Sequence, residues 1–355
     1  MQPASSLPTP RPVRVMVVDD SAVVRGLIAR SLDEDPGITV VARAENGQAA
    51  LIQMDHVEMD VVILDLEMPV MDGMTALPLM LARRPGVKVI VASTLTLRNA
   101  RLSLETLQAG ATDYVSKPDG SMAQAQDFHR HLLAKVKAIG GAASPAPAIA
   151  AAAVRPAPRP AFARTERPSV IAIGGSTGAP PVLIRLFEAL RGAVDLPILV
   201  AQHMPAMFTT LLAEQLGRAG DRPCAEATDG EPILPGRAYV APGGWHMTAE
   251  GRGDDRVLRL DQEPPEHFCR PAVDPLFRSV ARTYGAGAVA VILTGMGSDG
   301  ALGCRVMAEA GGRFVVQDEA TSVVWGMPGA AARTGLAEAI LPIPEIGAWL
   351  KRVAA

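Results

Sequence analysis

A glycine-rich turn directly behind a short apolar segment constrains the fold of this chain more than any other feature. Residues 170–173 have the composition of a buried strand, and Gly174-Gly175-Ser176-Thr177-Gly178 follows at once. Glycines at such a point permit a sharp turn that exposes the serine hydroxyl, and residues 179–181 then open a helix-like segment. The pattern predicts a strand–turn–helix elbow carrying a nucleophile. Taken alone it is a weak signal, because the same turn can cradle a phosphate.

Composition describes a soluble globular chain of more than one domain. At 355 residues the chain exceeds the usual size of a single core, which favours two domains. A hydrophobic share of 48% beside 20% charged residues is typical of ordinary soluble proteins. The three cysteines form no C-x-x-C pair, so neither a zinc site nor a disulfide framework is indicated. The net charge of −3 gives no reason to expect nucleic-acid binding.

Two low-complexity segments indicate the domain boundaries. Residues 139–168 are rich in alanine and proline and cannot bury a core, so we predict a semi-flexible linker between domains at 13–138 and 169–355. Residues 1–12 are proline-rich, lack the apolar core of a signal peptide and are predicted to be disordered. No apolar run reaches the roughly 18 residues of a membrane span. We therefore expect a cytoplasmic protein without membrane insertion.

Both domains are predicted to be α/β folds with parallel sheets. In the first, strand-like runs alternate five times with amphipathic segments, which predicts a doubly wound (βα)5 domain; the runs are 14–18, 39–42, 61–64, 87–92 and 113–115. In the second, continuous apolar runs are typical of strands buried on both faces; they are 170–173, 197–201 and 288–293. Ligands of such sheets bind at the carboxyl ends of the strands.

Polar residues follow four strands of the first domain, in the order Asp19-Asp20, Asp65, Ser93-Thr94 and Lys117-Pro118. Because these positions are carboxyl ends of parallel strands, the side chains are expected in one crevice. Three carboxylates there would repel one another unless a hard cation bound, and Mg²⁺ suits such oxygen ligands. The cation would also neutralise charge while Asp65 attacks a phosphoryl group, and Lys117 could pair with the product.

The motifs around these residues resemble those of response-regulator receiver domains. They are Val17-Val18-Asp19-Asp20-Ser21, the run 64–73 that contains Asp65, and Tyr114-Val115-Ser116-Lys117-Pro118. The resemblance implies that Asp65 is the phosphoacceptor and that Lys117 pairs with the phosphate. It further implies that Mg²⁺ is held by Asp19, Asp20, Asp65 and the backbone carbonyl of Glu67. Ser93 would supply the hydroxyl that follows the phosphoryl group, and Tyr114 would be the switch aromatic.

In the second domain a histidine and an aspartate follow two other strand-like runs. His203 comes just past residues 197–201, and Asp299 lies in a glycine-rich turn past residues 288–293. A serine, a histidine and an aspartate at strand ends can converge in one crevice, which is the set that acyl transfer needs. His203 would take the proton of Ser176, and Asp299 would orient the imidazole. Backbone N–H groups at Thr177 and Met296 could stabilise an oxyanion.

Other readings of this domain remain open. A hydrolase in which the catalytic residues follow one another along the chain as serine, aspartate and histidine would use Asp229 with His246 or His267. Neither histidine, however, follows a buried-strand pattern. A DNA-binding output would need a basic module, but residues 168–355 hold 16 Lys and Arg against 20 Asp and Glu, a net charge of −4. A nucleotide-phosphate loop lacks the usual glycine motifs. A receptor-binding adaptor with a decayed triad is the fourth alternative.

A second set of motifs resembles the chemotaxis methylesterase family, CheB. They are the elbow around Ser176, Gln202-His203-Met204-Pro205, and the runs 239–243, 270–274, 293–300 and 323–328. The resemblance implies hydrolysis of γ-glutamyl methyl esters on chemoreceptor cytoplasmic domains with release of methanol, and deamidation of receptor glutamines. It also implies a Ser176–His203–Asp299 triad without a cofactor in the esterase site, and a histidine kinase as phosphodonor.

Two positions depart from the family pattern. Gly175 stands where alanine is usual, and Ala179 stands where a second glycine is common. In the family the unphosphorylated receiver covers the active site until phosphorylation releases or repositions it. The face around Tyr114 and residues 96–101 are the candidate interface.

Overall fold

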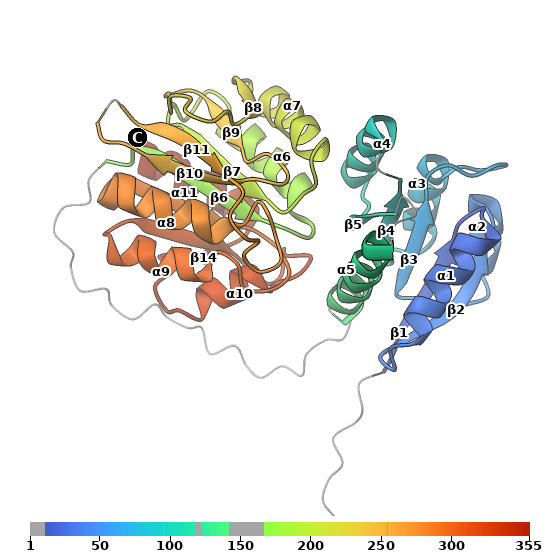
Figure 1. The fold of residues 1–355 in the computed structure, drawn as a ribbon. Coiled ribbons are helices and arrows are strands. Elements are labelled where there is room, and N and C mark those ends of the chain that lie inside the picture. Colours follow the sequence, from blue (N-terminus) through green and yellow to red (C-terminus); the bar gives the residue numbers. More distant parts are fainter. Residues whose placement is uncertain (1–10, 95, 118–121, 142–166, 254) are drawn as a thin grey trace, which may run out of the picture. The chain divides into compact units, whose positions relative to one another are not determined.

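The computed structural model describes residues 11–94, 96–117, 122–141, 167–253 and 255–355, without the side chains of 122–127 (Figure 1). The chain divides into two compact units, Met1–Pro145 and Ala146–Ala355. The predicted disordered segment 1–12 and linker 139–168 fall almost entirely outside the described residues; helix α5 continues to Gly141. None of the helices described is both long and apolar enough to cross a membrane.

The first unit is a five-stranded parallel sheet in the order β2-β1-β3-β4-β5. Its strands are β1 (Val13–Val18), β2 (Ile38–Ala44), β3 (Val61–Asp65), β4 (Lys88–Ser93) and β5 (Asp113–Ser116). Its helices are α1 (Ala22–Asp33), α2 (Gly47–Met54), α3 (Gly73–Arg83), α4 (Leu97–Gln108) and α5 (Met122–Gly141). All five strands lie where the alternating pattern predicts them, and the predicted fold class is confirmed.

Side-chain caps begin the first four helices of this unit. Ser21, Asn46, Asp72 and Thr96 each accept a hydrogen bond from the backbone N–H three residues further on. Such caps satisfy N–H groups that have no partner within the helix. Each strand therefore passes into its helix at a residue that the sequence specifies, which holds the strand ends in place.

The second unit is built on a seven-stranded parallel sheet in the order β14-β13-β12-β6-β7-β9-β8, beside an antiparallel pair β10-β11. Its strands are β6 (Val170–Gly175), β7 (Ile198–Gln202), β8 (Cys224–Glu226), β9 (Ala238–Val240), β10 (His246–Glu250), β11 (Val257–Asp261), β12 (Ala288–Ile292), β13 (Arg313–Gln317) and β14 (Ala339–Leu341). Its helices are α6 (Ala179–Leu190), α7 (Phe208–Gly220), α8 (Val273–Tyr284), α9 (Ala301–Glu309), α10 (Met327–Ala332) and α11 (Ile343–Ala354), with a 3-10 turn at Gly285–Gly287.

Helices cover both faces of this sheet (Figure 1). Helices α8, α9 and α10 pack with alternate strand residues such as Ala290 and Phe314 in one continuous core. On the opposite face α6 packs against both α7 and α11. Every residue of β6, β7 and β12 is buried, as expected for central parallel strands that helices cover on both sides.

Two helices of this unit begin at a glycine with left-handed backbone. Gly178 precedes α6 with φ of 75°, and Gly300 precedes α9 with φ of 84°. Both angles lie in the left-handed region, which glycine adopts without steric cost. The N-terminus of α6 consequently lies directly behind Ser176 without a side chain over it, and its dipole favours negative charge at that point.

Candidate active site

Ser176, His203 and Asp299 form a continuous hydrogen-bonded chain at the carboxyl edge of the second sheet. The Nδ1 atom of His203 lies 3.1 Å from Ser176 Oγ, and its Nε2 atom lies 2.7 Å from Asp299 Oδ2. The histidine therefore touches both other members, each through a different ring nitrogen. This arrangement can accept the serine proton at Nδ1 while Nε2–H remains hydrogen-bonded to the carboxylate.

Sheet hydrogen bonds that continue past the strand ends hold the three loops in register. Strand β6 lies between β7 and β12. The His203 N–H donates to the Gly175 carbonyl at 3.1 Å, and the Ser176 N–H donates to the Thr294 carbonyl at 3.1 Å. The backbone therefore positions the nucleophile and the base before their side chains interact.

Asp299 is held as an anion by backbone donors. Its side chain is 1% exposed and accepts N–H groups from Val273 at 2.6 Å, Asp274 at 2.9 Å and Gly300 at 2.8 Å. Burial alone would raise the pKa of this carboxyl, but the hydrogen bond with His203 and these N–H groups lower it below its ordinary value. Two of the donors open helix α8, whose N-terminus favours negative charge.

His203 is a stronger base than an isolated histidine. Burial alone would lower its pKa, yet the hydrogen bond with Asp299 and the neighbouring Cys269 side chain raise the pKa above its ordinary value. Nothing in the spacing of the three scattered cysteines indicates that Cys269 lies near the triad, so the sequence alone does not predict its position.

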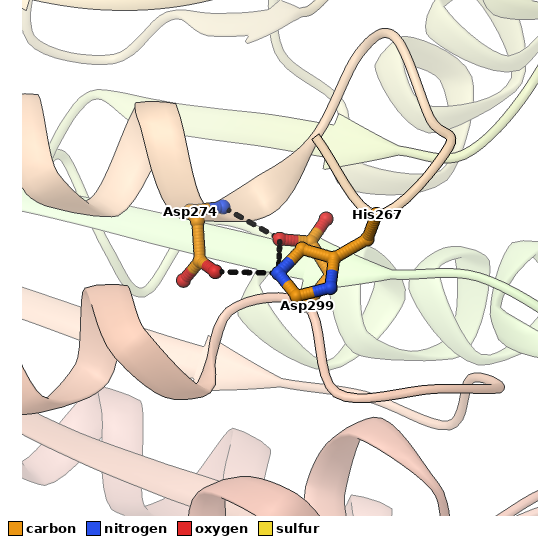
Figure 2. A group of neighbouring side chains, drawn as sticks. All are labelled: His267, Asp274 and Asp299. Atoms are coloured by element: carbon orange, nitrogen blue, oxygen red, sulfur yellow. Dashed lines mark hydrogen bonds and ion pairs between the residues drawn. The ribbon is translucent and has the colours of Figure 1, made fainter. Parts of the chain in front are cut away.

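A second histidine lies on the other side of Asp299. Figure 2 shows His267 between Asp274 and Asp299: its Nε2 is 3.0 Å from Asp274 Oδ2 and 4.0 Å from Asp299 Oδ1. Asp274 is 1% exposed, and burial, with a further contribution from the Asp299 charge, raises its pKa. The His267–Asp274 pair thus supports the segment that donates to Asp299.

A tight turn holds His267 and Cys269 at the triad. Glu266 and Cys269 form an isolated antiparallel bridge, and the two residues between them, His267 and Phe268, have φ of 51° and 62°. Positive φ costs a non-glycine residue roughly 1–2 kcal/mol, so such turns persist only where their surroundings fix them. The turn places His267 against Asp274 and leaves the Phe268 ring 83% exposed.

Three groups here come within reach of a shared cation. One ligand atom from each of His267, Asp274 and Asp299 lies within 4.8 Å of the others. Both Asp299 oxygens and Asp274 Oδ1 already accept backbone N–H groups. These oxygens therefore serve the polypeptide, and we assign the cluster a supporting role toward the triad.

The two departures from the family pattern compensate each other. A Cβ atom placed on Gly175 would lie 2.7 Å from the Ala179 Cβ and 3.0 Å from Gln202 Oε1. Real Cβ atoms do not approach that closely, so the methyl group of Ala179 occupies the space that an alanine at 175 would need. Gln202 Nε2 donates to the Ser176 carbonyl at 2.9 Å, which further fixes the elbow.

Backbone N–H groups are available next to the serine. Within the described part of the chain no hydrogen bond engages the N–H of Thr177 or of Met296. The Thr177 carbonyl accepts from the Thr294 hydroxyl at 3.0 Å, which ties the two loops together. Both N–H groups lie in loops that the register places beside Ser176, as an oxyanion site requires.

The residues of the alternative triad form no hydrogen bond with one another in the described part of the chain. Asp229 accepts the Leu260 N–H at 2.9 Å, and its nearest cation is Arg259 at 3.7 Å. His246 is 1% exposed and accepts the Ala272 N–H at 3.2 Å. His267 pairs with Asp274, as described above. None of the three hydrogen bonds given for these residues joins two members of that alternative.

The predicted acidic pocket assembles in the first unit. Lys117 Nζ lies 2.7 Å from Asp19 Oδ2 and 2.8 Å from Asp65 Oδ1. Ligand atoms of Asp19, Asp20 and Asp65 lie within 4.8 Å of one another. Burial raises the pKa of Asp65, and Lys117 opposes that rise. Apart from its ion pair with Lys117, the buried Asp19 Oδ2 has no hydrogen-bond partner among the described residues, so it retains a lone pair for a cation.

Ser93 and Glu67 of the predicted site contact helix α4. Ser93 Oγ lies 2.7 Å from Ser103 Oγ of that helix, and the Ser93 carbonyl accepts the Lys117 N–H at 2.7 Å. The Glu67 side chain accepts from Asn99 of the same helix at 3.1 Å. Tyr114 is buried, with Lys135 Nζ 5.1 Å from the centre of its ring.

These two sites define a class of protein: one α/β domain that carries a hydrogen-bonded serine, histidine and aspartate, and another that gathers carboxylates and a lysine at its strand ends. Family models agree with both parts. The CheB methylesterase family matches residues 171–350, and the response regulator receiver domain matches residues 15–125. The chain belongs to the CheB methylesterase family, and the predicted family and enzyme class, a carboxylic ester hydrolase, are confirmed.

Curated relatives match along the whole chain. A protein-glutamate methylesterase/protein-glutamine glutaminase of Rhodospirillum rubrum is 51% identical, covering 97% of this chain and 95% of its own length. One of Azospirillum brasilense is 49% identical, covering 97% of this chain and 93% of its own length. Among solved structures, the CheB methylesterase catalytic domain of Thermotoga maritima has a TM-score of 0.51 at 36% identity, covering 52% of this chain and 98% of that one.

The close approach of residues 175 and 179 yields a first prediction. Gly175→Ala should destabilise the protein by about 1–3 kcal/mol because the new methyl group overpacks the elbow, and esterase turnover should fall. Adding Ala179→Gly should recover much of the lost stability and turnover, since it removes the methyl group that the alanine at 175 would contact. Thermal unfolding and hydrolysis of a small ester would measure the two effects.

Gly26→Ala serves as the matched control, because no atom lies within 4 Å of a Cβ added to Gly26 in α1. It should leave esterase turnover at the parent level. Equal losses in Gly175→Ala and in the double variant would contradict the compensation.

The Cys269 side chain near His203 yields a second prediction. Only neutral His203 can act as the base, so kcat/KM rises with pH through the His203 pKa. Cys269→Ala removes a contact that raises this pKa, and the acidic limb of the pH profile should shift to lower pH. The shift would be measured from kcat/KM of a small ester against pH. Cys224→Ala in β8, at the far edge of the sheet, is the control; superimposable profiles for all three proteins would refute the contact.

Proposed function

We propose that the enzyme hydrolyses γ-glutamyl methyl esters on the cytoplasmic domains of chemoreceptors, releases methanol, and deamidates receptor glutamines. The observation that carries the proposal is the continuous hydrogen-bonded chain from Ser176 through His203 to Asp299. The printed names of the relatives, methylesterase and glutaminase, support the two reactions. Both attack an acyl carbon at the end of a glutamyl side chain, so one triad can serve both.

The proposed chemistry follows acyl transfer. Ser176 Oγ attacks the ester carbonyl carbon while its proton passes to His203 Nδ1, and the N–H groups of Thr177 and Met296 receive the oxyanion. The protonated His203 then gives its proton to the departing methoxide oxygen, which leaves as methanol, or to the departing amide nitrogen of a glutamine, which leaves as ammonia. Water, deprotonated by the same histidine, hydrolyses the acyl-enzyme and leaves a glutamate carboxylate. Asp299 stays ionised throughout and offsets the charge on the imidazolium.

The first unit would regulate this activity through phosphorylation of Asp65 by a histidine kinase. Receiver domains take up phosphoryl groups with Mg²⁺, and the residues fit that ion because Asp19, Asp20 and Asp65 gather their carboxylates in one place. These three, with the Glu67 carbonyl, would hold Mg²⁺, which offsets phosphoryl charge when bound. Lys117 already pairs with Asp65 and would pair with the phosphoryl group.

Helix α4 is the element through which we propose that the signal passes. The Ser93 hydroxyl contacts Ser103, and turning it toward a phosphoryl group on Asp65 would remove a contact from α4. Residues 96–101, at the start of this helix, and the face around Tyr114 would then present a different surface. A few kcal/mol of difference between two such states is enough to change the active fraction from minor to major.

Methanol release tests the function. Full-length protein supplied with a small phosphoryl donor and Mg²⁺ should release methanol from membranes that carry methylated chemoreceptors. Ser176→Ala should lower release by about 10⁴–10⁶-fold, the loss typical of removing a triad member. Asp65→Asn should retain basal release without stimulation by the donor. Failure of the parent protein to release methanol would overturn the substrate assignment, and equal release by Ser176→Ala would overturn the mechanism.

A further inference from the structure

A groove opens on the side of Asp299 that faces away from His203. Its volume is about 450 Å³, and parts of α8, α9, α10 and the turn at 266–267 enclose it. The lining residues are Glu266, His267, Asp274, Ser298, Ala301, Leu302, Arg305, Ala330, Arg333 and Thr334. The mechanism proposed above uses none of them as a reacting group, so the groove needs its own explanation.

Residues that line the groove neighbour the reaction centre in the chain and through hydrogen bonds. Ser298 precedes the triad aspartate in the chain, and the Asp274 N–H donates to Asp299. On the other wall, α10 starts beside the nucleophile: the Met327 N–H donates to Gly295 at 2.8 Å, and a Cβ on Gly295 would lie 2.8 Å from the Ser176 Cβ. From Met327 the rise along the helix to Arg333 is about 9 Å, at 1.5 Å per residue.

Two exposed arginines, Arg305 and Arg333, line the groove. Glu266 pairs with Arg278 at 2.8 Å, and Asp274 pairs with His267 at 3.0 Å. Arg305 and Arg333 are both exposed, and neither forms an ion pair with any residue the structure describes. Two guanidinium groups therefore face one cavity without a carboxylate partner, while the acids of its floor are already paired.

We propose that this groove binds the carboxylate of a second acidic side chain of the substrate protein, about two helical turns from the ester under attack. The proposal rests on the proposed function, because a protein whose glutamates are demethylated necessarily carries free glutamates as products. Ala301, Leu302 and Ala330 form an apolar surface that suits the aliphatic stem of a glutamate. Arg305 and Arg333 offer the planar donors that recognise carboxylates bidentately.

Spacing supports this occupant. Two turns of a substrate helix span about 11 Å, which is comparable to the rise of about 9 Å along α10 from Met327 to Arg333. A helix whose methylated glutamate reached Ser176 could therefore place a residue seven positions away over the groove. Arg305 and Arg333 would in this way select substrates without touching the reacting atoms.

Two synthetic helical peptides test the preference. Both carry one γ-glutamyl methyl ester, and seven residues away one has Glu where the other has Gln. The full-length protein, with phosphoryl donor and Mg²⁺, should hydrolyse the Glu peptide with a three- to tenfold higher kcat/KM, through a lower KM. The Arg305→Gln/Arg333→Gln variant should lose this preference. In Arg333→Glu the preference should shift toward a third peptide with Lys at that position.

Arg218→Gln is the matched control, because Arg218 is another exposed arginine, near the end of α7 at the far side of the sheet. It should keep the parent's preference for the Glu peptide. Added salt should reduce the preference in the parent, since exposed charges are screened. Equal kcat/KM for the Glu and Gln peptides in the parent, or an undiminished preference in the double variant, would overturn the proposal.

A binding measurement separates this proposal from the proposed function. The Ser176→Ala full-length protein should bind the unesterified Glu peptide more tightly than the Gln peptide in calorimetry, and the two arginine substitutions should remove the difference. This difference can be observed even if the parent protein releases no methanol. Methanol release without any binding difference would retain the esterase and reject the groove. Competition by inorganic phosphate equal to that by the Glu peptide would indicate a general anion site and also reject it.

Discussion

The register of β6 between β7 and β12 is the constraint on which the catalytic site depends. Ser176, His203 and the loop of Asp299 leave three adjacent parallel strands, and backbone bonds from His203 to Gly175 and from Ser176 to Thr294 extend the register beyond the sheet. A shift of one residue in either neighbouring strand would turn a triad side chain to the opposite face. The buried core on both faces of the sheet resists such a shift, so packing far from the serine maintains the geometry of the reaction.

Charge compensation is the second common principle of the two units. Buried carboxylates are tolerated only where hydrogen bonds or cations satisfy them. In the first unit Lys117 pairs with Asp19 and Asp65, while in the second the backbone at the start of α8 donates to Asp299. In the proposed function the first solution would give way to a cation and a phosphoryl group, whereas the second fixes the carboxylate permanently. This difference suits a site that changes state and a site that must stay constant.

The sequence predicted what strand ends determine and missed what loops determine. Asp65, Ser176, His203 and Asp299 could be found because each follows a recognisable strand, and parallel topology brings such residues together. The neighbours of the triad follow no strand: Cys269 and His267 reach it through a turn with two positive φ angles at residues that rarely adopt them. No local pattern announces such a turn. The sequence also did not single out Arg305 and Arg333, because what distinguishes them is the lack of an ion-pair partner among the described residues.

The close approach of residues 175 and 179 also limits how this elbow can change over time. With alanine at both positions the two methyl groups would collide, whereas glycine at both leaves the space empty. A change from Gly175 and Ala179 to alanine at 175 and glycine at 179 would therefore pass through an intermediate with glycine at both positions, at some cost in helix stability. Positions 175 and 179 are therefore expected to change together. The size of one methyl group requires Ala179 to be replaced before alanine can enter at 175.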